Sequence, residues 1–474
     1  MDIQIQDPQV AIDPHPCCFW IEITNCCNFK CTFCAYPYMN RKPEFMTFDT
    51  FRRTVDELVE SGLVRRNPLV GLHMLGEPLL HPEIWKFIEY MNSRGLATDL
   101  LTNGLLLTKE VIDRLSSLCV ARLTVSIQSP DESAYRQARS GAPKEWGRYM
   151  DSIRRAVERY LRMALEQPSG GIERLDLLYM TTFHYRPGMD GFSSWVDIRE
   201  RLEEWRMLAA GICPDSCMRH QVGCDADNIR KFRICTVGAR TLNFSLREAG
   251  SWAGTLDHAR KPEPVDEGRC SAPCDQLIVL ANGDVTLCCE DYDGNLAIGN
   301  VRETDLARIW MGEKARAIRN GFGENRVVAP YCQNCLGYRM NRSVDPVEDG
   351  FFPLERGGND GPFFQWMGNR ASMIVTTAEG DSRLVIRVLT ISPCSQDSPQ
   401  TFEVRLEQNV PVLFLLTRPH DWHTFELDLP APYISRFLLM SFETDRYLVP
   451  SQAGISADRR RLGAAVALPC HQQS

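Results

Sequence analysis

The sequence predicts an α/β fold, in which a partial parallel (β/α)6 barrel is followed by a small cysteine-rich module and an antiparallel β-sandwich. Three observations predict it. Short apolar strands alternate with amphipathic helical segments in the first half, cysteines flank a hairpin turn further on, and short alternating strands fill the last quarter. Repeated strand-then-helix units form parallel sheets with right-handed crossovers. Evenly spaced short strands are typical of sandwiches.

The bulk composition limits the classes of function. The length of 474 residues allows two to four domains with a large core. A net charge of −8 and an ordinary globular composition do not indicate nucleic acid or an anionic membrane as the main partner. Residues 1–15 are polar and acidic without a signal-peptide pattern, and no apolar run reaches membrane-spanning length. We therefore expect a cytoplasmic protein with no membrane span.

The cysteine content points to metal chemistry. The nineteen cysteines cluster in short-spaced groups, and no export signal precedes them. A disulfide-rich exported protein is the alternative, but metal ligation in a reducing compartment fits the spacing better.

Local signals place the crossovers of the barrel. Thr47 can cap a helix with Phe48, Phe51 and Val55 on its apolar face, and Gly62 closes it. Catalytic groups in such barrels lie at the carboxyl ends of the strands. The other expected elements are strands at 69–75, 98–101, 122–127 and 175–180, and helices beginning near Pro82 and Thr108 or covering 145–166 and 192–209.

Three cysteines follow the first apolar strand with the spacing C-x3-C-x2-C. They are Cys27, Cys31 and Cys34. Thiolates are soft ligands that hold iron–sulfur clusters. Three thiolates on a cluster of four irons leave one iron open to bind and activate a small molecule. The alternative is a tetrahedral zinc site that takes a fourth ligand such as Cys26.

This stretch resembles the signature of the radical S-adenosylmethionine (SAM) superfamily, including the aromatic Phe33 before the third cysteine. In that family SAM chelates the open iron through its amino and carboxylate groups. An electron from the [4Fe-4S] cluster then cleaves SAM to methionine and a 5′-deoxyadenosyl radical, which takes a hydrogen atom from the substrate. The resemblance implies SAM, a SAM-binding [4Fe-4S] cluster and an electron donor such as flavodoxin or ferredoxin.

Further motifs stand at the ends of later strands. Gly76-Glu77-Pro78 resembles the family's GGE motif, whose acidic residue and backbone receive the SAM amino group, although Leu75 stands where the first glycine is common. Thr102-Asn103-Gly104 resembles a strand-end motif of relatives, or is a simple turn. The resemblance assigns SAM binding to Phe33, Gly76, Glu77, Asn103, Ser126 and Gln128.

The segment 211–235 carries four cysteines and a histidine without a trusted ligand spacing. Inert thiols, a further metal site and a catalytic thiol all stay open. The candidate hydrogen-atom donors are Cys235, Cys217 and Cys213, and the segment also contains Cys224 and His220.

A second group of cysteines surrounds the hairpin turn Asn282-Gly283-Asp284. The stretch resembles the auxiliary-cluster modules called SPASM or twitch. Because 337–345 supplies no further cysteine, the shorter twitch form with one auxiliary [4Fe-4S] cluster is predicted, with structural zinc as the alternative. The predicted ligands are Cys270, Cys288, Cys332 and Cys335, and Cys274 and Cys289 are rivals for the first two places.

The tail reads as a sandwich after a linker at 343–362. It loosely resembles small sandwich modules beside sugar-handling enzymes, so we expect a separable module that recruits substrate. Trp366, Trp422 and His423 face either a glycan or the sandwich core. Strands are expected at 373–377, 383–389, 401–406, 411–417, 422–429 and 437–442, and the domains at 1–245, 246–345 and 350–474.

The resemblance implies a radical SAM enzyme acting on a substrate C–H bond. The sandwich favours epimerisation or oxidation of a carbohydrate or glycoside. Epimerisation needs a hydrogen-atom donor, usually a thiol, whereas oxidation needs an electron sink. A peptide maturase and a two-cluster electron-transfer protein are the alternatives.

Overall fold

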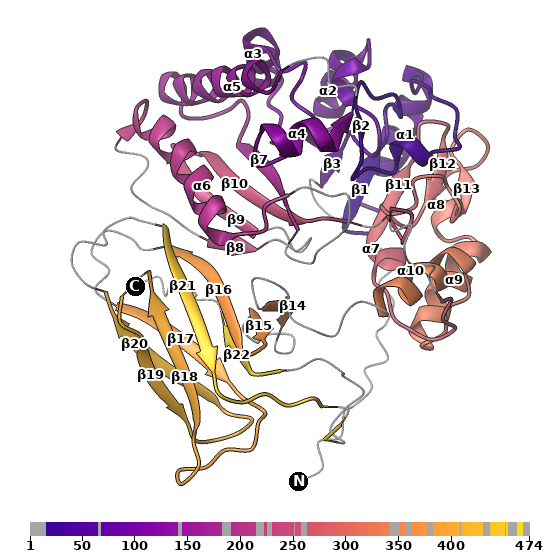
Figure 1. The fold of residues 1–474 in the computed structure, drawn as a ribbon. Helices are drawn as coiled ribbons and strands as arrows, with labels where there is room; N and C mark the ends of the chain where they lie inside the picture. Colours follow the sequence, from indigo (N-terminus) through magenta and orange to yellow (C-terminus); the bar gives the residue numbers. More distant parts are fainter. Residues whose placement is uncertain are drawn as a thin grey trace.

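The computed structural model carries one large mixed sheet and a separate pair of sheets (Figure 1). It describes residues 16–467 except 65–67, 141–144, 183–190, 215–221, 225–229, 251, 257–262, 341–350, 357–362, 377–382, 408, 430–436, 451 and 454–461. No helix in these ranges is long and apolar enough to cross a membrane.

Six parallel strands form the barrel part of the large sheet. Their order is β1, β3, β4, β5, β7 and β10, and the sheet stays open, so the predicted partial parallel (β/α)6 barrel is confirmed. The strands are β1 (Cys18–Ile21), β3 (Leu69–Gly71), β4 (Ala97–Thr102), β5 (Arg122–Gln128), β7 (Arg174–Thr181) and β10 (Arg240–Glu248). The antiparallel strands β8 (Val222–Cys224) and β9 (Arg230–Val237) extend the β10 edge.

Helices cover one face of this sheet. As expected, Thr47 and Thr108 accept hydrogen bonds from the first-turn amides of their helices. The crossover elements are α1 (Phe48–Glu60), η2 (Pro78–Leu80), α2 (Ile84–Ser93), α3 (Lys109–Ser117), α4 (Glu132–Ala138), α5 (Trp146–Glu166) and α6 (Trp195–Ala210). Between β1 and α1 lie β2 (Lys30–Cys31) and η1 (Tyr36–Tyr38), and β6 (Arg139–Ser140) follows α4.

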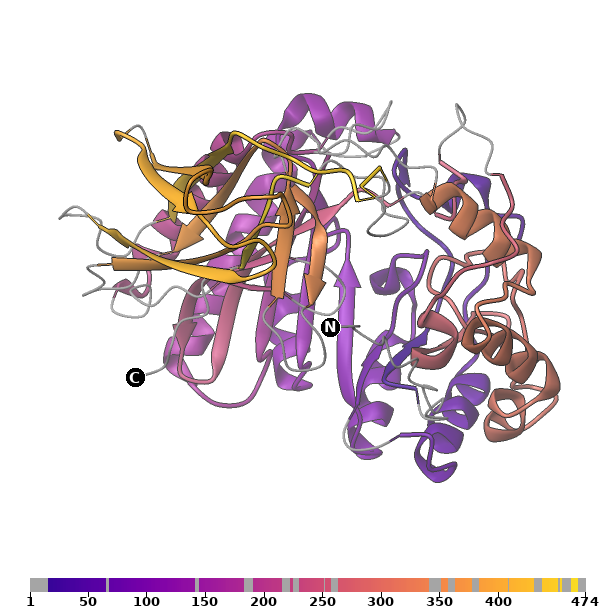
Figure 2. The same ribbon diagram turned by 90° about the horizontal axis from the view of Figure 1, so that it is seen from below.

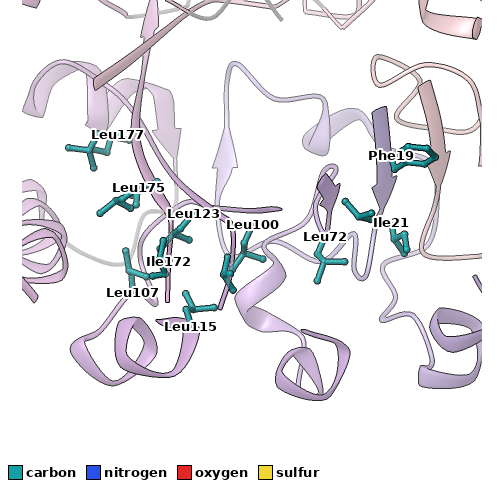
Figure 3. Close-up of a cluster of buried hydrophobic side chains, with 14 of the residues drawn as sticks. Phe19, Ile21, Leu72, Leu100, Leu107, Leu115, Leu123, Ile172, Leu175 and Leu177 are labelled. Carbon is teal, nitrogen blue, oxygen red and sulfur yellow. The ribbon is translucent and has the colours of Figure 1, made fainter. Parts of the chain in front are cut away.

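Alternation along the strands separates two environments. Leu100, Leu123 and Leu175 point to the helices and are fully buried (Figure 3). Their neighbours Asp99 and Arg122 form an ion pair on the opposite, concave face. Polar side chains therefore line the face where a substrate would meet the strand ends.

Two predicted elements differ in the structure. The strand expected at 69–75 ends at Gly71, because the chain then leaves the sheet and the Leu75 amide donates to the Glu22 carboxylate. The helix expected from 192 begins at Trp195, because Phe192 forms backbone hydrogen bonds with Met180 and Thr182.

The cysteine-rich module continues the barrel sheet. The strand β11 (Gln276–Val279) pairs in parallel with β1, and β12 (Asp284–Thr286) returns antiparallel through the predicted hairpin turn, where Gly283 has φ +85. The module also contains α7 (Ala272–Asp275), β13 (Gly299–Asn300), α8 (Leu306–Trp310), α9 (Glu313–Gly323) and α10 (Pro330–Met340).

The tail is an antiparallel sandwich, as predicted. Its sheets have the orders β14-β15-β22-β17-β20 and β16-β21-β18-β19. The predicted linker is wrong in part, since β14 lies within it. The strands are β14 (Phe351–Arg356), β15 (Phe363–Met367), β16 (Arg370–Thr376), β17 (Arg383–Leu389), β18 (Gln400–Leu406), β19 (Val412–Leu416), β20 (Trp422–Asp428), β21 (Phe437–Thr444) and β22 (Ala464–Ala467).

The sandwich packs on the barrel at α6 and β9 (Figure 1, Figure 2). Ile374 and Phe437 are buried in the same apolar cluster as the barrel core, and the Phe437 ring lies 6.0 Å from that of Phe232. A free barrel would expose this contact, and the separability of the sandwich stays a prediction.

The aromatic residues proposed to meet a glycan have other surroundings. Trp366 and His423 are buried, and the His423 ring accepts from the amides of a turn at 417–418. Trp422 packs beside Trp366 and lies under the guanidinium of Arg387. These placements fit packing and turn roles.

Candidate active site at the carboxyl ends of the strands

The three cysteines of the first motif lie in one loop that follows β1. Burial, together with the charges of the neighbouring thiols, raises the pKa of Cys27 to about 11 and that of Cys34 to about 12. Packing thiols together away from water is unfavourable for bare thiolates, whereas iron would offset their charge. The donor set therefore fits an iron–sulfur cluster.

In the described part of the chain, no three His, Cys, Asp or Glu side chains converge on a point that could hold one metal ion. The structure does not test the zinc alternative, which stays a prediction.

Gly76 joins the second motif to the cysteine loop. A Cβ atom at this position would lie 2.1 Å from the Thr24 carbonyl oxygen and 2.9 Å from that of Cys26. The next amide, that of Glu77, donates to the Cys26 carbonyl over 2.8 Å. Only glycine allows the two loops to approach this closely.

Glu77 presents a buried carboxylate beside the thiols. Its side chain is 2% exposed and accepts from the Thr102 hydroxyl (2.8 Å) and the amides of Asn103 (2.7 Å) and Leu79 (3.1 Å). Burial raises the pKa of Glu77 to about 6, although these hydrogen bonds oppose the rise. The group is thus largely ionised at neutral pH and suits a cationic amine.

The remaining predicted SAM contacts lie at the ends of β4 and β5. The side-chain amide of Asn103 donates to Asn28 Oδ1 over 2.7 Å, next to Cys27. The side-chain amide of Gln128 donates to Ser126 Oγ over 2.8 Å, at a register shift where Gln128 has φ +64. The bulge interrupts the regular alternation at the end of the strand.

Arg139 is a site residue that the sequence did not reveal. Its buried guanidinium donates to the carbonyls of Ser126 and Ile127, and the Phe29 ring lies 4.7 Å away. The thiols of Cys27 and Cys31 are among the groups that raise the pKa of Arg139, although its burial acts in the opposite direction. β6 pairs Arg139 with Cys31 across a large sequence separation, so no local motif marks it.

Phe33 connects the first thiol loop to the segment after β10. The Trp252 indole donates to the Phe33 carbonyl over 3.1 Å, and its ring meets that of Tyr292 edge-on at 6.2 Å. The Ala253 amide donates to Glu290 Oε2 over 2.9 Å. Trp252 and Ala253 have φ near +50, and this backbone lies between the two cysteine groups.

The cysteines of the module gather around Cys270. Burial, together with the charges of Cys270 and Cys335, raises the pKa of Cys332 to about 12. Burial also raises the pKa of Cys288 well above its usual value, with Cys289 and Cys270 adding to the rise. The four predicted ligands are thus brought together.

The two rival cysteines are also close to this group. Cys274 neighbours Cys270 as well as the Arg319 guanidinium, and the Cys289 amide donates to Gln276 Oε1 over 2.9 Å. The choice of ligands stays a prediction.

Two of the three candidate hydrogen-atom donors, Cys235 and Cys213, lie away from this site. Cys235 lies on β9 opposite Leu242, at the amino-terminal end of β10, within the helix-facing core. Cys213 is buried just beyond α6 and donates to the Ala209 carbonyl. Cys217, His220 and the Cys224 side chain lie outside the described residues.

Comparison with protein families agrees with this arrangement. Residues 21–165 match the radical SAM superfamily, and residues 270–336 match SPASM, an iron–sulfur cluster-binding domain. The chain contains a radical SAM domain and a SPASM domain. The radical SAM domain implies SAM and a [4Fe-4S] cluster, and the SPASM domain implies auxiliary iron–sulfur binding.

Similar proteins cover only part of the chain. An AdoMet-dependent heme synthase of Nitratidesulfovibrio vulgaris is 29% identical, covering 31% of this chain and 39% of that protein. A PqqA peptide cyclase of Bradyrhizobium diazoefficiens is 27% identical, covering 25% and 30%. The matches thus span less than half of either relative. The structure of BtrN in complex with AdoMet and 2-DOIA has a TM-score of 0.38 and 15% identity, covering 65% of this chain and 88% of that one.

Proposed function

We propose that this chain is a cytoplasmic radical SAM enzyme that abstracts a hydrogen atom from a substrate carbon on the concave face of the barrel. The observation that carries the proposal is the junction of two loops. The buried cysteines after β1 and the Gly76-Glu77 loop after β3 are joined by the Glu77–Cys26 backbone hydrogen bond and by the close approach of Gly76 to Thr24.

Each residue of this junction has a role in the proposal. Cys27, Cys31 and Cys34 hold the SAM-binding cluster, and Glu77 accepts hydrogen bonds from the SAM amino group. When bound, the cluster and SAM supply a 5′-deoxyadenosyl radical. Gly76 leaves room for backbone contact, and Phe33, Asn103, Ser126 and Gln128 line the neighbouring strand ends. These are the proposed SAM contacts.

The Arg139 guanidinium lies against the same site. Its guanidinium is held by backbone carbonyls at the end of β5 and by the rings of Phe29 and Tyr149. A fixed cation beside Cys27 and Cys31 offsets the negative charge that ligating thiolates bring.

The SPASM domain holds an auxiliary cluster in this proposal. Its ligands are Cys270, Cys288, Cys332 and Cys335, in the one-cluster twitch form. Because β11 pairs directly with β1, the domain is fixed to the strand that leads into the first cysteine loop. A cluster held by these cysteines would supply an electron acceptor or a binding group for the substrate.

We propose a carbohydrate or glycoside as the substrate class. Hydroxyl, amide and charged side chains on the concave face, such as Ser126, Asn243 and Asp176, support a polyhydroxylated ligand. Cys213 and Cys235 are buried away from the strand ends and give no support to these two thiols as donors, whereas Cys217 lies outside the described residues. Both oxidation and epimerisation therefore belong to the proposal. Peptide modification is the second candidate, supported by the similarity to PqqA peptide cyclases.

Anaerobic reconstitution tests the reaction class. Protein loaded with iron and sulfide and reduced by flavodoxin, ferredoxin or dithionite should release 5′-deoxyadenosine from SAM. A Cys31→Ala variant should release none, and Cys119→Ala, at an exposed position, is the control. Full activity of the Cys31 variant would refute the proposal.

The product distinguishes the substrate reactions. Stoichiometric SAM consumption with a carbonyl product indicates oxidation, and deuterium incorporated from solvent indicates epimerisation. Turnover of a peptide substrate and not of sugars would favour the second candidate.

A further inference from the structure

Charged side chains cover much of the concave face. Asp176 on β7 lies 3.2 Å from the Arg174 guanidinium and 3.6 Å from Lys231 Nζ, and it accepts from the Asn243 amide over 2.7 Å. These contacts join β7, β10 and β9. On each of the three strands, every second side chain therefore lies on the concave face, opposite the helices.

Cations outnumber carboxylates on the described part of this face. On strands β4, β5, β7, β9 and β10 the carboxylates of this face are Asp99 and Asp176. The cations are Arg122, Arg174, Lys231, Arg233 and Arg247. His73 faces the same space, because the charges of Asp99, Arg122 and Arg247 all act on its ring. The surplus of positive charge favours an anionic ligand.

One hydroxyl on this face is buried without a partner. Ser245 is 1% exposed, and its Oγ makes no hydrogen bond within the described residues. A buried hydroxyl is normally satisfied, so this group points to a ligand that completes it. Lys231 stands directly opposite Ser245 in the β9–β10 register, and Arg247 is the next residue of β10 on the same face.

The strand register places Ser245 near the carboxyl ends of the parallel strands. Ser245 pairs with Leu178, which in turn pairs with Ser126. Ser245 and Lys231 thus lie at the same level of the sheet as a proposed SAM contact, and Arg247 lies closer to the carboxyl ends. In parallel α/β folds this is the level at which ligands bind.

We propose that Ser245, Lys231 and Arg247 bind an anionic group of the substrate, a phosphate or a carboxylate. The inference rests on the proposed function, because it places that group on the wall facing the radical. The serine hydroxyl donates one hydrogen bond, the ammonium group supplies a compact charge, and the guanidinium can donate two parallel hydrogen bonds. Within the proposed carbohydrate class, the substrate is therefore a phosphorylated or acidic compound rather than a neutral sugar.

Calorimetry tests this site by titrating small anions into the reconstituted holoenzyme that already contains SAM. The probes are inorganic phosphate and acetate, each compared with chloride at equal ionic strength. We expect saturable binding of at least one probe, and the stronger probe identifies the source of the anionic oxygens. Ser245→Ala and Arg247→Gln should each weaken it about tenfold, the usual effect of losing one contact to a charged ligand.

Controls separate this inference from the proposed function. Arg148, whose side chain is 81% exposed on α5, provides a matched variant, Arg148→Gln, that should bind the probe normally. Iron content and substrate-free SAM cleavage should be unchanged in all three variants. Absent probe binding, or equal binding by wild type and both site variants, would overturn the inference. Loss of substrate-free SAM cleavage in both site variants would also overturn it, by assigning the residues to SAM. Failure of wild-type SAM cleavage refutes the proposed function instead.

Discussion

Substitution of Gly76 by alanine should lower the rate of SAM cleavage in a protein that still folds. The added Cβ would lie 2.1 Å from the Thr24 carbonyl oxygen, and an ordinary contact begins near 3.4 Å, so the loops must part by about 1.3 Å. The atoms that the Cβ would overlap, the carbonyl oxygens of Thr24 and Cys26, belong to the backbone, so no side-chain rotation relieves the overlap. A displacement of roughly 1 Å at a reacting site can cost about 100-fold in rate. We expect a loss of this size in 5′-deoxyadenosine formation.

The assay compares reconstituted Gly76→Ala protein with wild type at equal iron content. Gly147→Ala is the matched control, because Gly147 lies in α5 and a Cβ there meets nothing within 4 Å. The control should keep the wild-type rate and gain slightly in stability. A Gly76→Ala protein with the wild-type rate and SAM affinity would show that the closeness of the two loops is irrelevant to the reaction.

Three further changes test other parts of the structure. Arg41→Met leaves the carboxylate of Glu22 buried without its ion-pair partner, so the free energy of unfolding in urea should fall by about 3–5 kcal/mol. Arg53→Met, which removes a surface ion pair, should lower it by less than about 1 kcal/mol, and equal losses in the two variants would contradict the argument. Cys332→Ser should lower iron from about eight to about four per chain while SAM cleavage persists, and unchanged iron would remove this ligand. Phe437→Ala should destabilise the chain by about 3–5 kcal/mol in a single unfolding transition, whereas separate transitions for barrel and sandwich would restore the independent module.

Much of the barrel is visible in the sequence because its signals are local. Thr47 and Thr108 cap helices through hydrogen bonds that span three residues, and Gly62 adopts φ +70 just after the first of these helices. The parallel strands are short apolar runs bounded by turn residues, so the sequence indicates where they lie. The sequence does not indicate β14 and β15, because these short strands depend on pairing with each other rather than on a local pattern of their own.

The sandwich shows a different limit of sequence reading. Its strands were found from their alternation, but alternation does not tell which outer face stays in water. Phe437 and Ile374 lie on the outer face of one sheet and are covered by the barrel. The linker composition predicts an independent module, and the sequence does not reveal the apolar contact at this face, because the contact forms only in the folded chain.

The three-cysteine loop could be recognised from the sequence alone. Its ligands fall within eight residues, so one short loop carries the chemistry wherever the rest of the chain lies. Arg139, the Glu22–Arg41 pair and the group formed by Ser245 and Lys231 could not be recognised in this way. Each joins segments that are distant in sequence, and their charges become informative only when strand pairing places them side by side away from water. An isolated charge in a sequence is usually solvated, and only burial in the folded chain obliges it to have a partner.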